Sequence, residues 1–223
     1  MSLARRLVAE GLGTAFLLAI VIGSGIMGER LAGGNIAIAL LANSIATGCG
    51  LVVLITVFGP ISGAHFNPAV TLAEAVARQR PWSDVLPYVA VQIVGAFAGV
   101  AAAHFMFELP MYFASTHART GVAQWSSEFV ATFGLLLTIW GGVRYRPAWV
   151  PVCVAAYITA AYWFTSSTSF ANPAVTLARA ASDTFAGIVP GHALGFIVAQ
   201  LAGAMAATWL AAWLFAKPER DAA

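Results

Sequence analysis

The stretch Asn67-Pro68-Ala69-Val70-Thr71-Leu72-Ala73 occurs twice in this chain of 223 residues, and its second copy runs from Asn172 to Ala178. The copies lie 105 positions apart (172 − 67), each inside a strongly apolar stretch. In each copy a polar Asn precedes a Pro, the residue best suited to the first position of a helix. Internal repeats with interrupted apolar segments in corresponding positions point to the permeation site of a membrane protein. The repeat therefore predicts a duplicated pore rather than an enzyme.

The composition is that of an integral membrane protein. Hydrophobic residues make up 60% of the chain and charged residues only 9%, and the mean hydropathy is +0.83. A soluble domain has about 25% charged residues, so most of this chain is not exposed to water. The net charge of +2 calls for no nucleic-acid partner, because Lys and Arg gather in the cytoplasmic loops of membrane proteins. Cys49 and Cys153 fall within apolar segments, and we interpret both as small buried hydrophobes rather than a disulfide.

Six segments are long and apolar enough to span a bilayer. Two further segments are shorter, and the helical stretches predicted after their prolines are 68–77 and 173–180. A helix of about ten residues rises roughly 15 Å, which is half of a hydrocarbon core of about 30 Å. Each short helix can therefore reach the middle of the membrane without crossing it. The predicted spans are 5–27, 36–58, 83–107, 124–143, 148–165 and 191–215.

The predicted spans divide into two halves. Residues 1–107 form the first repeat, 108–123 a connecting loop, and 124–223 the second repeat. Each half has three spans and one half-helix, and an odd number of crossings places the two halves in opposite orientations. Eight basic residues fall on the side of the termini and three on the other, which predicts that both termini are cytoplasmic in a multi-pass inner or plasma membrane protein. The eight are Arg5, Arg6, Arg78, Arg80, Arg144, Arg146, Lys217 and Arg220, and the three are Arg30, Arg119 and Arg179.

The chemistry of the repeated motif suits a pore for neutral solutes. Asn67 and Asn172 are expected to cap the two half-helices through their side-chain oxygens, which leaves each amide NH₂ able to donate into the space ahead. Two helix N-termini that meet at the midplane repel cations. The segments 60–64 and 165–169 are expected to offer backbone carbonyls as acceptors. Glu10 and Glu128 are carboxylates within spans, and we expect them to accept hydrogen bonds from these loops rather than to relay protons.

These motifs resemble those of the aquaporin family, the major intrinsic proteins, which include the aquaglyceroporins. The resemblance rests on the stretch Ser62–Val70, on Asn172-Pro173-Ala174, and on Glu10 and Glu128. It covers the whole chain and implies an all-α membrane fold with six transmembrane helices and two re-entrant half-helices. It also implies passive conduction across the lipid bilayer, no cofactor or metal, and a homotetramer with one pore per subunit.

The chain departs from the family pattern at the predicted selectivity filter. Most members carry Arg immediately after the second Asn-Pro-Ala, where this chain has Val175. Offsets from the motifs place the other filter positions at Thr47, Ala160 and Ser169, with Phe170 as the alternative to Ser169. A filter without Arg and without bulky residues at most positions is wide and uncharged. Together with the resemblance to bacterial members that lack this Arg, it predicts passage of glycerol and metalloid hydroxides such as arsenite, as in arsenic-resistance channels, besides water.

Arg179 lies four residues after Val175 and therefore on the same helix face one turn outward. One hypothesis is that Arg179 reaches the outer vestibule and attracts polar solutes. The other is that it snorkels toward lipid headgroups.

Three other functions stay open from the sequence. The first is a water-selective aquaporin, and the second is a coupled secondary transporter, since inverted repeats with broken helices also build those. The third is a non-conducting adhesive protein. The predicted midplane carries two Asn amides and no acid, which favours a channel over a transporter.

Overall fold

The computed structural model describes residues 1–216, and the regular elements in that range are all helices. Lys217 and Arg220, which entered the predicted charge count, lie outside the described residues. Eight α-helices are joined by short links, three of which contain a single 3₁₀ turn. The α-helices are α1 (Leu3–Leu31), α2 (Ile36–Ser62), α3 (Pro68–Val76), α4 (Val85–Met106), α5 (Val122–Tyr145), α6 (Val150–Phe164), α7 (Pro173–Arg179) and α8 (Ala193–Leu214). The 3₁₀ turns are η1 (Trp82–Asp84), η2 (Pro147–Trp149) and η3 (Pro190–His192).

Six helical segments within residues 1–216 are long and apolar enough to cross a membrane, as the sequence predicted. They correspond to α1, α2, α4, α5, α6 and α8, with the 3₁₀ turns extending three of them. Two spans extend further than predicted: α1 continues to Leu31 instead of ending near residue 27, and α2 continues through Pro60 to Ser62 instead of ending near residue 58. Pro60 has no N–H to bond the Thr56 carbonyl, so the last turn lacks one hydrogen bond, and the helix ends at Gly63 in the left-handed conformation.

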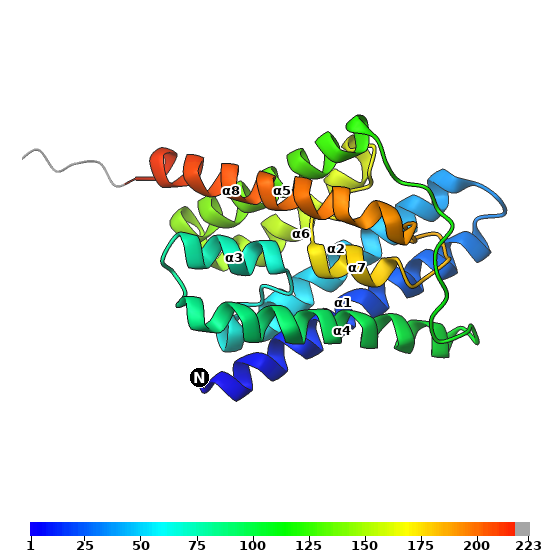
Figure 1. Ribbon diagram of the computed structural model, residues 1–223, viewed down its shortest axis with the longest axis horizontal. Helices are drawn as coiled ribbons and strands as arrows, with labels where there is room; N and C mark the ends of the chain where they lie inside the picture. Colours follow the sequence, from blue (N-terminus) through cyan, green and yellow to red (C-terminus); the bar gives the residue numbers. More distant parts are fainter. Residues whose placement is uncertain (217–223) are drawn as a thin grey trace, which may run out of the picture.

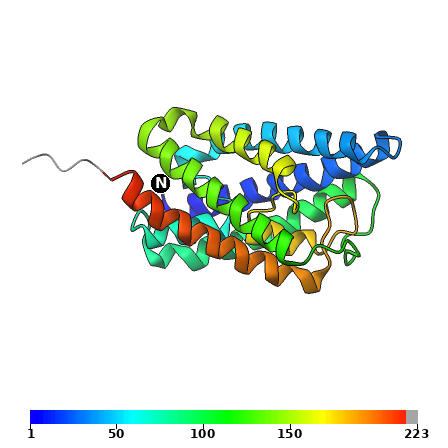
Figure 2. The same cartoon turned by 90° about the horizontal axis from the view of Figure 1, so that it is seen from above.

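Figure 1 shows the six spans running side by side along the length of the molecule, with α3 and α7 enclosed between them. The N-terminus, the end of α8 and the α3–α4 link lie at one end of the molecule, which we call the terminal end. The α1–α2 link and the long loop 107–121 lie at the other, which we call the loop end (Figure 2). The two half-helices begin in the middle and extend toward opposite ends, α3 toward the terminal end and α7 toward the loop end.

Glycines let the spans approach closely at equivalent points of the two halves. A methyl group added at Gly95 of α4 would overlap the backbone carbonyl of Gly11 in α1. In the second half, a methyl group added at Gly203 of α8 would overlap the carbonyl of Phe129 in α5. Small residues at helix contacts allow the close packing on which helix association in lipid depends. The α1–α4 and α5–α8 pairs thus form two similar frames, and both half-helices contact α4 and α8.

Candidate functional site: the cavity between the half-helices

Each half-helix begins with the predicted cap. The Asn67 side-chain oxygen accepts a hydrogen bond from the Ala69 N–H at 2.9 Å, and Pro68 is the first helical residue. The Asn172 oxygen accepts from the N–H groups of Ala174 at 3.0 Å and Val175 at 3.3 Å. The predicted capping by both asparagines is confirmed. Both helix N-termini, which carry partial positive charge, therefore lie at the middle of the protein.

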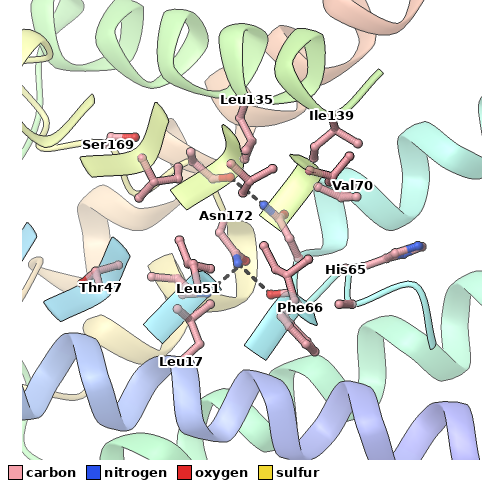
Figure 3. Close-up of a pocket in the computed structure, with 18 of the residues that line it drawn as sticks. Leu17, Thr47, Leu51, His65, Phe66, Val70, Leu135, Ile139, Ser169 and Asn172 are labelled. Carbon is pink, nitrogen blue, oxygen red and sulfur yellow. Dashed lines mark hydrogen bonds between the residues drawn. The ribbon is translucent and has the colours of Figure 1, made fainter. Parts of the chain in front are cut away.

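The two asparagines also join the two halves. Asn67 Nδ2 donates to the Ala171 carbonyl at 2.8 Å, and Asn172 Nδ2 donates to the Phe66 carbonyl at 2.8 Å. Figure 3 shows the Asn172 amide beside Phe66 at the centre of the cavity. Each NH₂ thus uses one hydrogen on the opposite loop. The second hydrogen of each NH₂ remains able to donate to a passing solute.

The loops before the half-helices share an unusual backbone. Ala64 and Phe66 have φ of 51° and 49°, and their counterparts Ser169 and Ala171 have φ of 51° and 49°. Non-glycine residues in this left-handed region cost about 1–3 kcal/mol each and persist only where neighbouring groups hold them. The strained residues occupy equivalent positions in the two halves, so the strained backbone is a shared feature of the two loops that form the site.

Glu10 and Glu128 hold these strained loops. Glu10 is fully buried, and its two carboxylate oxygens accept hydrogen bonds from the backbone N–H groups of His65 at 2.9 Å and Phe66 at 2.7 Å. The Glu128 carboxylate accepts from the N–H groups of Phe170 at 2.9 Å and Ala171 at 2.8 Å. Because every one of these N–H groups would otherwise be buried without a partner, each carboxylate fixes the loop that it contacts.

A cavity of about 140 Å³ runs between the half-helices and four of the spans. One wall is apolar, and its residues recur every three or four positions along each helix, as one helical face requires. The opposite wall consists of the two loops, 63–67 and 169–172. The predicted carbonyl segments are therefore wrong at their starts, since 60–62 belong to α2 and 165–168 do not line the cavity. The apolar wall comprises Leu17, Val21, Leu51, Ile55, Leu135, Ile139, Val143, Val150, Val154 and Ile158.

Toward the loop end the cavity is lined by Thr47, Tyr162, Ser169 and Val175. Thr47 Oγ1 and the Tyr162 hydroxyl are 3.2 Å apart and form a hydrogen bond between α2 and α6. The predicted position Ala160 is corrected here, because Ala160 is exposed on the outer surface of α6 and does not line the cavity. Two residues along a helix turn the side chain by roughly 200°, which accounts for the error.

Tyr162 could have been found from the sequence. Val150, Val154, Ile158 and Tyr162 are spaced by four residues, and this stripe is the face of α6 that lines the cavity. The ungapped offset from the motif ignored this periodicity. The corrected position carries a bulky phenol instead of a methyl group, so the loop end of the cavity is narrower and more polar than the sequence predicted.

Phe170 and Arg179 form a pair beside the cavity. Phe170 packs its ring edge-on against Phe196 of α8 at a centroid distance of 5.2 Å. The Arg179 guanidinium lies 3.3 Å from the centre of the Phe170 ring, and its Nε donates to the Ala186 carbonyl. Arg179 is only 2% exposed. Both hypotheses for Arg179 are therefore wrong, since it neither opens into a vestibule nor snorkels to the surface.

At the terminal end, His65 and Glu74 line the cavity. His65 Nε2 lies 3.0 Å from a Glu74 carboxylate oxygen, and His65 Nδ1 lies 2.9 Å from the Thr71 hydroxyl. Arg80 also contacts Glu74, at 3.4 Å. Cys49, predicted to be buried, is instead exposed on α2 and points away from the cavity.

Six spans and two capped half-helices around one cavity define a multi-pass membrane channel. The family model described as major intrinsic protein matches residues 1–147. The chain is 56% identical over 212 residues to the aquaglyceroporin AqpS of Rhizobium meliloti (strain 1021), which covers 95% of this chain and 91% of that protein. It is 33% identical over 218 residues to aquaporin NIP2-3 of Zea mays, covering 93% of this chain and 70% of that protein.

Among solved structures, the aquaglyceroporin from Plasmodium falciparum matches with a TM-score of 0.73 at 20% identity, covering 94% of this chain and 95% of that one. At this identity the likeness shows the fold alone. The chain belongs to the major intrinsic protein family. It is therefore a passive membrane channel for small neutral solutes and not an enzyme.

Proposed function

We propose that this channel conducts uncharged polyhydroxylated solutes, with glycerol and undissociated metalloid hydroxides such as arsenite passing besides water. The observation that carries the proposal is Val175. It lines the loop end of the cavity, where most members of the family have an arginine. Thr47, Tyr162 and Ser169, which line the same end, are also uncharged at neutral pH.

The two walls of the cavity suit such solutes. The cavity has one polar wall and one apolar wall. A polyhydroxylated solute can turn its hydroxyls toward the loop carbonyls and the asparagine amides, and its carbon chain toward the aliphatic wall. Side chains that can form hydrogen bonds with solute hydroxyls recur along the path at Thr47, Tyr162, Asn172, Asn67 and His65. The name of the 56% identical relative, an aquaglyceroporin, supports the same substrate class.

We also propose that the two halves are inverted repeats, 1–107 and 124–223 joined by 108–123, and that both termini face the cytoplasm. The excess of basic residues predicted on the terminal side supports this orientation. A homotetramer in the plasma membrane follows from family resemblance. The protein would then act as four parallel pores.

The test is stopped-flow light scattering on proteoliposomes, with water, glycerol and arsenite gradients compared against protein-free vesicles. The blocking variant is Thr47→Trp, because Thr47 is buried and faces the cavity. The matched control is Ala160→Trp, on the outer surface of α6. We expect glycerol and arsenite fluxes at least about tenfold above protein-free vesicles, lost in Thr47→Trp and kept in Ala160→Trp. Water flux alone, with glycerol at the protein-free rate, would reject the proposal in favour of a water-selective channel.

A further inference from the structure

Arg119 belongs to the long loop 107–121 but is bound into the wall at the loop end. Its Nε donates to the Gly187 carbonyl at 2.8 Å, and its Nη1 donates to the Ser167 carbonyl at 3.3 Å and approaches the Thr168 hydroxyl at 3.5 Å. Its guanidinium lies 5.3 Å from the centre of the Phe170 ring. The loop therefore delivers a fixed cation to the segment that immediately precedes the second Asn-Pro-Ala motif.

Arg179 brings a second cation to the same place from α7. Both guanidinium groups contact one aromatic ring, that of Phe170. That ring belongs to the loop 169–172, which lines the cavity. Neither arginine lines the cavity itself. Two positive charges thus lie behind the wall at the loop end, although the usual cavity-facing arginine is replaced by Val175.

The acids of the described residues do not cancel this charge. Within residues 1–216, neither Arg119 nor Arg179 makes a salt bridge. Glu128 is the buried acid that holds this loop, and its oxygens are engaged by two backbone N–H groups and the Gln200 amide. One carboxylate against two guanidinium groups leaves the wall at this end positive.

We propose that Arg119 and Arg179 add a cation barrier to that of the two helix N-termini, acting through the wall in place of the missing filter arginine. A charge behind the wall repels cations without narrowing the path, because its field crosses a low-dielectric layer with little screening. A cavity-facing arginine both narrows the path and repels cations, whereas arginines behind the wall only repel cations. The loop end of the path stays free of charged side chains for neutral solutes, and protons and metal cations are still excluded. This inference rests on the proposed function, since a barrier matters only in a conducting pore.

The experiment measures proton and sodium leak into proteoliposomes with entrapped fluorescent indicators, alongside glycerol flux in the same vesicles. Arg119→Gln removes one charge, and Arg119→Lys keeps it. Arg30→Gln is the matched control, because Arg30 likewise donates to a carbonyl and lies over an aromatic ring, both of Phe107, and not of the 167–170 segment. We expect the leak of Arg119→Gln to rise at least about tenfold, and Arg119→Lys and Arg30→Gln to match wild type. Glycerol flux should stay within about twofold throughout.

A second pair of variants leaves every arginine in place. Thr168 has φ of 63° and lies against Arg119, and Asp and Asn both tolerate this left-handed conformation better than a β-branched residue does. Thr168→Asp places a carboxylate beside the guanidinium, whereas Thr168→Asn adds no charge. We expect a cation leak in Thr168→Asp only. If glycerol flux is intact and neither Arg119→Gln nor Thr168→Asp leaks above its control, the barrier proposal is overturned while the proposed function stands. Absent glycerol flux in wild type would instead overturn the proposed function.

Discussion

Replacing Glu10 by Gln keeps the shape of the side chain and exchanges one carboxylate oxygen for an NH₂ group. Each oxygen of Glu10 is fixed by one backbone donor, Oε1 by the His65 N–H and Oε2 by the Phe66 N–H. The side-chain partners Ser62 and Gln92 can reorient, since Gln92 Oε1 has no partner within residues 1–216. The backbone N–H groups cannot. Whichever way the new amide points, one buried N–H faces another donor.

The loss of stability follows from that one buried N–H group. A buried donor without a partner costs about 1–3 kcal/mol, and the remaining hydrogen bonds weaken because they lose a charged acceptor. We expect a total loss of about 2–4 kcal/mol in the free energy of unfolding. For a chain of this size each kcal/mol lowers the melting temperature by about 2–4 °C, so the expected decrease is about 5–15 °C. Thermal unfolding of the purified protein in detergent measures it directly.

The second half of the molecule provides a replicate and α1 provides a control. Glu128→Gln should behave like Glu10→Gln, because its two oxygens are likewise fixed by separate backbone N–H groups, those of Phe170 and Ala171. Glu29→Gln removes an exposed carboxylate from the same helix as Glu10. If Glu10→Gln melted within about 1 °C of Glu29→Gln, the carboxylate would not hold the loop and the reasoning would be refuted.

Two further predictions concern packing and pH. Gly95→Ala and Gly203→Ala should each lower the free energy of unfolding by about 1–3 kcal/mol through overpacking. Both variants should therefore melt below Gly191→Ala, the control in which the added methyl group meets no atom within 4 Å. Equal melting temperatures for all three variants would contradict the close helix contacts. A hydrogen bond from the Thr116 backbone N–H lowers the pKa of Asp183 below its usual 3.8, so this carboxylate stabilises the folded loop above pH 3.8 and less as pH falls below it. Wild type should therefore melt above Asp183→Asn at pH 6, and the difference should shrink toward pH 3; a difference that grows on acidification would show the opposite sign.

The repeat, the half-helices and their caps could be predicted because they depend on local chemistry. Asn67-Pro68 and Asn172-Pro173 are cap and first-turn residues wherever they occur, and a helix of about ten residues cannot cross a bilayer. The buried acids of the spans were recognisable for a similar reason, since Glu10 must find donors and the loop residues have them.

The positions around the loop end could not be predicted as well, because they depend on how four separate segments meet. Ala160 was chosen by counting from a motif, whereas the periodicity of α6 selects Tyr162. Arg179 was placed by helix geometry alone, and the ring of Phe170 and the Ala186 carbonyl, which hold it in the wall, come from outside its helix. Arg119 lies in no recognisable sequence motif, and its role depends on contacts between the loop 107–121 and residues far along the chain, which local sequence patterns do not predict.

The central claim is that neutral solutes pass through a cavity whose loop end is uncharged and bounded by Val175. The most direct measurement is the ratio of glycerol to water permeability in proteoliposomes for wild type, Val175→Leu and Val175→Arg. We predict that Val175→Arg lowers glycerol permeability by at least about tenfold while water flux persists, and that Val175→Leu, which adds bulk without charge, has a smaller effect. An unchanged ratio in Val175→Arg, with the protein folded and conducting, would place the narrowest point elsewhere and contradict the account.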